Sequence, residues 1–306
     1  MRKTVFYFLA AVFLLSAAAL SSSPASAVSG PASKILTITP ATTKPTIQPG
    51  ESKNGKFQII NQGTADYPVH VYAAPYTVHS EAYTPDFTPV KGKLNPSSWI
   101  HFTVSDANIT PNQTLDVNYT ITVPSGTAPG GYYAVAFAET KSPGSGKQGV
   151  IINERVGEIF YIQVAGNVRQ AGKLLTWSSN FWQKQPLNAT LRLENDGSID
   201  YASDIHITVG DLFGRAKYVF ATQKEVLPQT IRKIPVTWDH TPSLGLFKVT
   251  GTATVSGKAV GLRTHYVLVV SPTFRIIGLV LVAMLLAYSF GRKFGRVLRR
   301  TKKTTE

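Results

Sequence analysis

The chain has 306 residues, no cysteine and a formal net charge of +14. The lack of cysteine excludes disulfides, thiol chemistry and cysteine-ligated metals, so exported domains would have to be held by packing alone. Ten of the 31 cations lie at Arg2, Lys3, Arg275 or in the last fifteen residues, which leaves 21 cations against 16 acids elsewhere. The excess of positive charge therefore indicates membrane topology rather than nucleic-acid binding.

The first segment predicts a secretory signal peptide. Arg2 and Lys3 precede an apolar stretch over residues 5–20, and the small residues Ala25-Ser26-Ala27 follow it. Basic, apolar and Ala-x-Ala elements in this order are typical of such a signal. We expect residues 1–27 to be removed by cleavage after Ala27, with an uncleaved signal anchor as the alternative.

Residues 28–271 have the pattern of β-strands. Residues 115–123 (LDVNYTITV) alternate between apolar and polar side chains, and Pro124 follows them. A period of two over nine residues predicts a half-buried strand. Similar runs, separated by Pro, Gly, Asn and Asp clusters, occur at 57–60, 69–73, 158–164, 188–194, 204–209, 247–255 and 265–270. No helical period interrupts them, so we expect an antiparallel, all-β fold.

An internal repeat predicts two domains. The pattern N-x-G-x-x-D-Y occurs at residues 61–67 and again at 195–201. Two weaker correspondences follow in the same order, 111–114 with 228–230 and 129–135 with 245–249. Three pairs of matching segments that occur in the same order along the chain predict two copies of one fold. We therefore expect two tandem immunoglobulin-like β-sandwich domains, residues 28–165 and 166–271.

Signatures of catalysis are missing from the sequence. The six histidines form no H-x-x-x-H pair, and no G-x-S-x-G elbow occurs. The glycine motif at residues 144–149 precedes an apolar, strand-like run rather than a helix, so we interpret it as a hairpin loop and not as a dinucleotide site. We therefore predict that the chain is not an enzyme and binds no cofactor.

Two further motifs resemble functional sites, but we assign no function to either. Glu194, Asp196, Asp200 and Asp204 gather around one turn, but they lack the spacing of a calcium loop, so no metal is predicted. Residues 227–230 (LPQT) resemble a cell-wall sorting signal. The glycine of that signal is replaced by isoleucine, and the motif precedes the apolar segment by more than 40 residues. We interpret this match as a coincidence.

Aromatic residues in two regions that are expected to be exposed are the candidate contact surface. Tyr76, Tyr83 and Phe87 fall in the segment 74–98, which is rich in Pro, Tyr and Thr and is expected to be a loop, whereas Trp177 and Trp182 fall near the expected domain junction. Aromatic side chains on loops stack on sugar rings or anchor protein partners. Packing in the core is the alternative interpretation.

The carboxy-terminal segment predicts a membrane anchor. Residues 274–290 are apolar, and the tail of residues 291–306 carries seven cations against one acid: Arg292, Lys293, Arg296, Arg299, Arg300, Lys302 and Lys303. Cationic flanks stay cytoplasmic, so the tail is expected inside and both sandwiches outside, in a single-pass protein of the cell membrane. The lipid bilayer is the expected partner of this segment, and a buried core helix is the alternative.

The whole arrangement resembles the WxL-interacting proteins of Gram-positive surfaces. The resemblance is in architecture, in the Asn-x-Gly turns and in the P-x-G-x-Y run Pro129-Gly130-Gly131-Tyr132-Tyr133. It implies a peptidoglycan-binding first domain and a second domain that binds host or partner proteins. The sequence has no W-x-L triplet, which fits an interacting protein rather than a WxL protein.

These observations predict a non-enzymatic surface protein that binds cell-wall peptidoglycan or another surface protein through its sandwich loops. The alternative is an adaptor or chaperone-like subunit of a membrane complex. Neither hypothesis involves nucleic acid.

Overall fold

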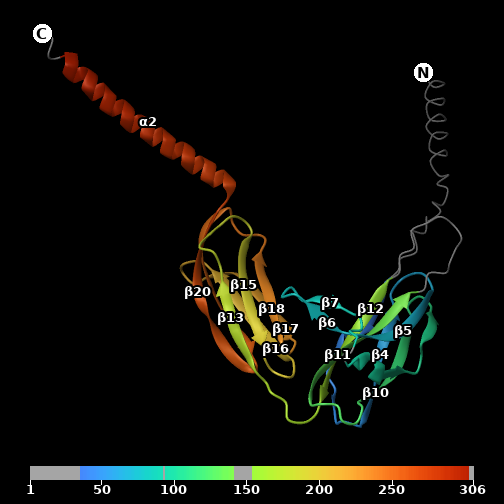
Figure 1. Cartoon of the computed structure of the whole chain (residues 1–306). Helices are drawn as coiled ribbons and strands as arrows, with labels where there is room; N and C mark the ends of the chain where they lie inside the picture. Colours follow the sequence, from blue (N-terminus) through green and yellow to red (C-terminus); the bar gives the residue numbers. More distant parts are fainter. Residues whose placement is uncertain (1–34, 92–93, 141–153, 303–306) are drawn as a thin grey trace, which may run out of the picture.

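The computed structural model describes residues 35–91, 94–140 and 154–302. The predicted signal peptide, the glycine motif at 144–149 and the last four residues lie outside these ranges. Within them the chain forms two β-sandwiches that meet at an angle, followed by one long helix that leaves the second sandwich (Figure 1).

The first sandwich, called domain 1 below, has two sheets. One sheet has the order β1-β4-β10-β8, formed by β1 (Leu36–Thr39), β4 (Ser52–Asn61), β10 (Thr114–Thr122) and β8 (Ile100–Phe102). The other has the order β2-β12-β11-β5-β9, formed by β2 (Thr42–Thr43), β12 (Arg155–Val164), β11 (Gly130–Thr140), β5 (Tyr67–Pro75) and β9 (Asp106–Ile109). The short strand β3 (Thr46–Ile47) also pairs with β12, in parallel. Their facing side chains form one buried core around Phe57, Ile121 and Phe160.

The second sandwich, called domain 2, repeats this order. Its small sheet is β13-β15-β18, formed by β13 (Gly172–Ser178), β15 (Leu187–Asn195) and β18 (Thr230–Trp238). Its large sheet is β14-β20-β19-β16-β17, formed by β14 (Trp182–Gln183), β20 (Lys258–Val270), β19 (Leu244–Val255), β16 (Tyr201–Gly210) and β17 (Ala216–Val226). In both sandwiches a short strand joins the large sheet in parallel. The prediction of two tandem immunoglobulin-like sandwiches is confirmed.

The alternating pattern determines which faces are buried. In β10, Val117, Tyr119 and Ile121 are buried, whereas Asp116 and Asn118 point to solvent. Burying a large apolar side chain stabilises a fold by roughly 1.5 to 3 kcal/mol, so the register that buries all three is strongly preferred.

The repeated N-x-G turn has one chemical role in both domains. The Asn61 amide donates hydrogen bonds to the carbonyls of Ala65 (2.8 Å) and Ile109 (3.0 Å), and its oxygen accepts one from the backbone of the glycine two residues later (2.9 Å). Asn195 donates in the same way to Ile199 and Val226, both at 2.8 Å. Both asparagines are fully buried. The motif therefore satisfies backbone groups at an equivalent corner of each sandwich.

The segment 74–98 is not the loop that the sequence predicts. It contains a two-stranded hairpin of β6 (Thr77–His79) and β7 (Thr84–Asp86), and then the 3₁₀ helix η2 (Pro96–Trp99). The hairpin is short and its strands pair only with each other. Val78 and Tyr83 pack in a small cluster with Ile159 and Tyr161 of β12, and this contact requires no alternating pattern along the hairpin strands. It reaches away from domain 1 toward domain 2 (Figure 1).

The helix α2 (Pro272–Lys302) is long and apolar enough to cross a membrane over Pro272–Gly291, with a mean hydropathy of 2.0. Twenty residues at 1.5 Å each span about 30 Å, the thickness of a bilayer core. None of this stretch is buried against the sandwiches. A core helix would be buried, so that alternative does not describe α2, and the apolar stretch begins two residues earlier than the predicted span.

Candidate functional site

The hairpin β6–β7 of domain 1 inserts an aromatic side chain into domain 2. Tyr83 is only 8% exposed and packs against Tyr161 of domain 1 and Leu227 of domain 2. Its hydroxyl accepts a hydrogen bond from the Leu227 backbone (2.9 Å) and is hydrogen-bonded to the Thr230 hydroxyl. The Arg232 guanidinium lies 4.2 Å from the centre of its ring. Tyr83 thus fills a site made largely by the turn between β17 and β18.

A carboxylate of the same hairpin adds a second attachment. Glu81 accepts two hydrogen bonds from the Arg192 guanidinium, one of them at 2.6 Å, and its backbone carbonyl accepts one from Lys233 (2.8 Å). The Arg192 guanidinium holds the pKa of the Glu81 carboxyl below its usual range. A bidentate pair of this kind fixes orientation, which a single contact would not.

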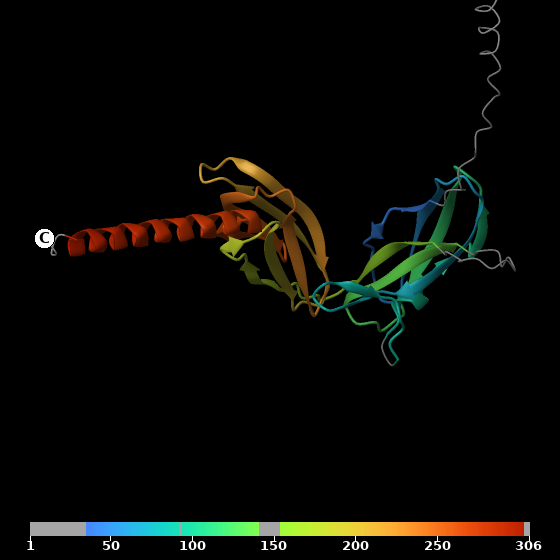
Figure 2. The ribbon, with the colours of Figure 1, turned by 90° about the horizontal axis from the view of Figure 1, so that it is seen from above.

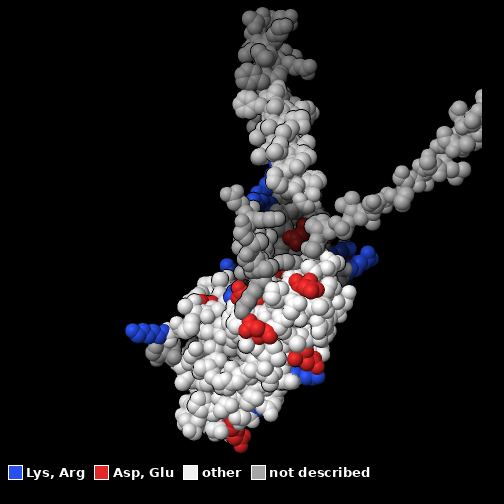
Figure 3. All heavy atoms as spheres, turned by 90° about the vertical axis from the view of Figure 1, so that its right-hand side faces the viewer, with Lys and Arg blue, Asp and Glu red and all other residues white. Residues whose placement is uncertain are grey.

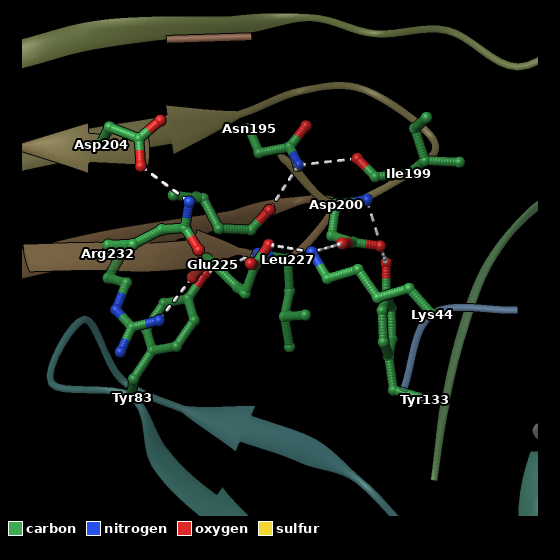
Figure 4. Close-up of polar contacts among 12 residues, drawn as sticks. Lys44, Tyr83, Tyr133, Asn195, Ile199, Asp200, Asp204, Glu225, Leu227 and Arg232 are labelled. Carbon is green, nitrogen blue, oxygen red and sulfur yellow. Dashed lines mark hydrogen bonds and ion pairs between the residues drawn. The ribbon is translucent and has the colours of Figure 1, made fainter. Parts of the chain in front are cut away.

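The strand β11 makes the other half of the junction (Figure 4). The Tyr133 hydroxyl donates to the Asp200 carboxylate (3.0 Å) and accepts from the Asp200 backbone (3.1 Å). Gly131 donates its backbone N–H to the Ser198 carbonyl at 2.8 Å. A Cβ on Gly131 would lie 2.1 Å from the Tyr133 hydroxyl, so a side chain there would displace the hydroxyl that bonds Asp200 of domain 2.

A partly buried charge network adds to the junction. The Lys44 ammonium lies 2.8 Å from a Glu225 carboxylate oxygen and 3.5 Å from one of Asp200. Both carboxylates are largely shielded, with 16% and 13% of their side chains exposed. Burial and the Asp200 charge raise the pKa of Tyr133 far above its usual value, so the Tyr133 hydroxyl stays a donor. Apolar packing, ion pairs and backbone hydrogen bonds thus all connect the two domains at the junction.

We expect Tyr83→Phe to loosen the junction without unfolding either sandwich. The ring remains buried, but the backbone N–H of Leu227 loses its acceptor, which costs about 2 kcal/mol for a buried group. Hydrogen exchange of the Leu227 amide in the full chain should accelerate by more than tenfold, while amides in the centre of β10 stay unchanged. Equal protection of Leu227 in both proteins would contradict this role of Tyr83.

Beside the junction lies an apolar groove of about 160 Å³ on domain 1. Val90 and Leu94 are exposed at its rim, and Tyr132 in its wall packs on Trp99 at 5.0 Å. Its lining is mostly proline, aromatic and aliphatic: Pro75, Tyr76, Thr77, Thr88, Pro89, Val90, Leu94, Asn95, Pro96, Gly131, Tyr132 and Tyr133. Gly131 and Tyr133 also belong to the junction, so the shape of the groove depends on how the two domains are held.

The predicted contact residues of domain 1 lie together but differ in how far they are covered: the Tyr76 ring lies 6.2 Å from that of Phe87 and packs in the cluster of Tyr83. Tyr76 lines the groove, whereas Phe87 is half-buried and meets the Phe137 ring edge-on at 4.9 Å. Tyr83 is buried between the domains. The expectation that it faces an outside partner is therefore wrong, because the hairpin that carries it folds onto domain 2.

The predicted contact residues of domain 2 lie elsewhere. The strand β13 starts near the junction and carries Trp177 toward the opposite end of the sandwich, so neither tryptophan lies at the junction as the sequence suggested. Trp177 is half-buried, donates to the Arg263 carbonyl (2.8 Å) and packs near His265. Trp182 is 56% exposed. The five aromatics therefore do not form one surface.

The acidic turn of domain 2 is occupied by cations and amides of the chain itself. The Lys173 ammonium lies 2.8 Å from Glu194 and 3.5 Å from Asp196, and Asp204 accepts a hydrogen bond from Gln223 (2.7 Å). In the part of the chain that the structure describes, no three acidic or histidine side chains come together as metal ligands.

The sequence analysis missed most residues of the junction. Glu81 and Lys44 lie in stretches without any motif, and their partners are 111 or more positions away in the chain. A signal was present for Tyr133 and Asp200, since Asp200 lies in the repeated N-x-G-x-x-D-Y pattern and Tyr133 in the run Pro129-Gly130-Gly131-Tyr132-Tyr133. The LPQT residues have a role here too, because Leu227 is buried in this junction.

Neither a protein-family model nor a curated protein sequence matches the chain. Several solved structures of fimbrial chaperones are similar in fold. The YadV chaperone is 11% identical, over 76% of this chain and 99% of that one, with a TM-score of 0.42. The chaperone–adhesin complex CsuC–CsuE of Acinetobacter baumannii is 14% identical over 78% and 99% (0.39), and the Escherichia coli chaperone DraB is 12% identical over 75% and 98% (0.39).

Proposed function

We propose that this chain is a membrane-anchored, non-enzymatic binding protein that presents the groove of domain 1 to a partner protein outside the cell. The observation that carries the proposal is the apolar groove beside the junction, with Val90 and Leu94 exposed at its rim. The helix α2 would hold both domains at the membrane, with the basic tail on the cytoplasmic side.

The composition of the groove favours a protein side chain over a sugar. Sugar sites combine an aromatic platform with several converging hydrogen-bond groups. Here the side chains that offer such groups are chiefly Thr77, Thr88 and Asn95, among prolines, aliphatic residues and tyrosines. A volume of about 160 Å³ suits one large apolar side chain. Binding of peptidoglycan remains the alternative.

The face of domain 1 that is turned away from domain 2 carries few charged side chains (Figure 3). On the face that Figure 3 shows, acidic and basic side chains are few and scattered among uncharged ones. Such a face offers little long-range attraction to a polyanion or a polycation. Affinity would then come from the apolar anchor in the groove, with the fixed domain angle setting its orientation.

Site-specific photo-crosslinking tests the proposal. A benzophenone amino acid is placed at Leu94 in the groove, and in a matched variant at Asn118, which is exposed on the outer face of β10. In irradiated cells the Leu94 variant should give one discrete protein adduct, which Tyr76→Ala weakens, and the Asn118 variant should give none. Equal adducts from both positions, or none from Leu94, would contradict a groove partner. Sedimentation of the full chain with purified peptidoglycan, unaffected by Tyr76→Ala, would favour the alternative.

A further inference from the structure

The register of domain 2 places three of its loops at the end where α2 begins. β16 runs away from the junction and ends at Gly210, which is paired with Lys248 of β19. The last residue of β20, Val270, is paired with Leu244 and leads directly into α2. The β16–β17 turn, the loop before β15 and the loop before β19 therefore share one end of the sandwich, here called the distal end. Figure 2 shows the golden β16–β17 hairpin extending beside the start of the red helix.

The large apolar side chains that domain 2 exposes gather at this distal end. Phe213, 89% exposed, and Leu212 occupy the tip of the β16–β17 hairpin. Phe181 and Trp182 are more than half exposed beside β20, and Leu244 starts β19. None of the large apolar residues exposed in domain 2 lies in a loop at the junction end. Exposed apolar residues close to the start of an apolar helix indicate a surface that contacts a membrane or another protein.

Hydrogen bonds within the β16–β17 turn keep Phe213 exposed. The Asp211 carboxylate accepts hydrogen bonds from the backbone of Phe213 (2.9 Å) and of Arg215 (3.0 Å). Gly214 completes the turn with a φ of +81° and donates to the Asp211 carbonyl at 3.1 Å. These bonds hold the backbone of the tip in one conformation and direct the phenylalanine away from the sandwich.

Trp182 is tied to the first turn of α2. The strand β14 pairs in parallel with β20, so that Trp182 lies opposite Leu268, four residues before the helix. The Arg275 guanidinium lies 5.8 Å from the Trp182 ring and donates to the carbonyls of Val270 (3.1 Å) and Gln183 (3.3 Å). Tryptophan is the side chain that membrane proteins place at the level of the lipid headgroups.

The charges at the distal end suit an anionic lipid surface. Lys184 and Arg275 line an open pocket of about 460 Å³ whose other polar walls are asparagine, glutamine and threonine side chains. Arg215 is exposed at the hairpin tip. Of the acids at this end, Asp211 is already bound by the backbone of its turn and lies 3.4 Å from Lys217, whereas Asp239 is exposed in the loop before β19. Cations within a few ångströms of the bilayer each contribute about 1 kcal/mol of attraction to anionic headgroups.

From these observations we infer that the distal end of domain 2 docks on the anionic bilayer surface. Phe213 and Trp182 enter the interface, and Lys184, Arg215 and Arg275 face the phosphates. The inference rests on the proposed membrane anchor and adds a second attachment to it. With domain 2 docked and the junction closed, the groove of domain 1 is held at a fixed height above the membrane.

Because the chain has no cysteine, a single introduced cysteine is labelled at that site alone. Single cysteines are introduced by Phe213→Cys and Trp182→Cys, and the matched control is Lys258→Cys, exposed at the start of β20 at the junction end. Leu285→Cys, exposed on α2, reports the span itself. Each full-length variant carries an environment-sensitive fluorophore and is placed in nanodiscs with and without phosphatidylglycerol.

In anionic nanodiscs the labels at 213 and 182 should emit at shorter wavelength and be quenched less by iodide than the label at 258. Removing phosphatidylglycerol should increase their quenching. Labels at 213 and 182 that are quenched as fully as the label at 258, while the label at 285 stays shielded, would overturn docking and leave the anchor standing. A fully quenched label at 285 would contradict the anchor, and docking with it.

Discussion

Asn195→Ala should destabilise domain 2 by about 4 kcal/mol. The substitution removes two hydrogen-bond donors from the buried carbonyls of Ile199 and Val226 and the acceptor of the Gly197 backbone N–H. Each buried polar group left without a partner costs about 1 to 3 kcal/mol. Urea unfolding of the full chain in detergent micelles, followed by hydrogen exchange in peptides from β15 and β18, measures this loss for domain 2 alone.

Asn188→Ala is the matched control for this prediction. Asn188 lies on the same strand, is exposed, and makes its side-chain hydrogen bonds at the surface. We expect its replacement to cost well under 1 kcal/mol. If both variants unfolded at the same urea concentration, the buried corner would not be a source of stability.

The effect of Glu158→Gln on the free energy of unfolding of domain 1 should depend on pH. The change that it causes should be about 3 kcal/mol more stabilising at pH 8 than at pH 4. Glu158 is fully buried on β12, and one carboxyl oxygen accepts a hydrogen bond from the Thr43 hydroxyl. The other oxygen makes no hydrogen bond to any residue that the structure describes. Burial disfavours the charged form and raises the pKa of Glu158 from 4.5 to about 7.

The direction of the pH dependence follows from where the proton is bound. Between pH 4.5 and about 7 the folded domain keeps a proton that the unfolded chain has lost. The free energy of unfolding therefore falls as the pH rises through this window, and the loss is complete above it. Glutamine has no such proton, so the variant should lack this slope. Parallel pH profiles of the two proteins, followed by urea unfolding and hydrogen exchange in β10 and β12, would refute the burial argument.

Much of the fold could be predicted because local patterns agree with the global arrangement. The alternation in residues 115–123 gave the correct faces of β10, and the N-x-G repeat marked an equivalent corner in each sandwich. The strand β17 (Ala216–Val226) was missed. It is an edge strand, with exposed or half-buried residues along most of its length, so no face of it requires a clear apolar pattern.

The candidate site was harder to predict, because its residues meet only through tertiary contacts. Glu81 and Arg192 are 111 positions apart, and Lys44 and Glu225 come from different domains. The prediction for Tyr83 failed for the same reason: an aromatic residue in a polar, proline-rich segment indicates an exposed contact only if no other domain covers it. Tyr76 and Trp182 kept enough exposure to stay candidates, each at its own surface.

The most direct test of the account is the distance between the two sandwiches in the intact chain. Spin labels at Asn118→Cys on β10 and Ala221→Cys on β17, both exposed positions, report that distance by double electron–electron resonance in nanodiscs. If the junction of Tyr83, Glu81, Tyr133 and Lys44 holds the domains as one body, the distribution is narrow and single, centred on the distance in this structure. A broad distribution with several maxima would contradict the rigid junction and the groove geometry that depends on it.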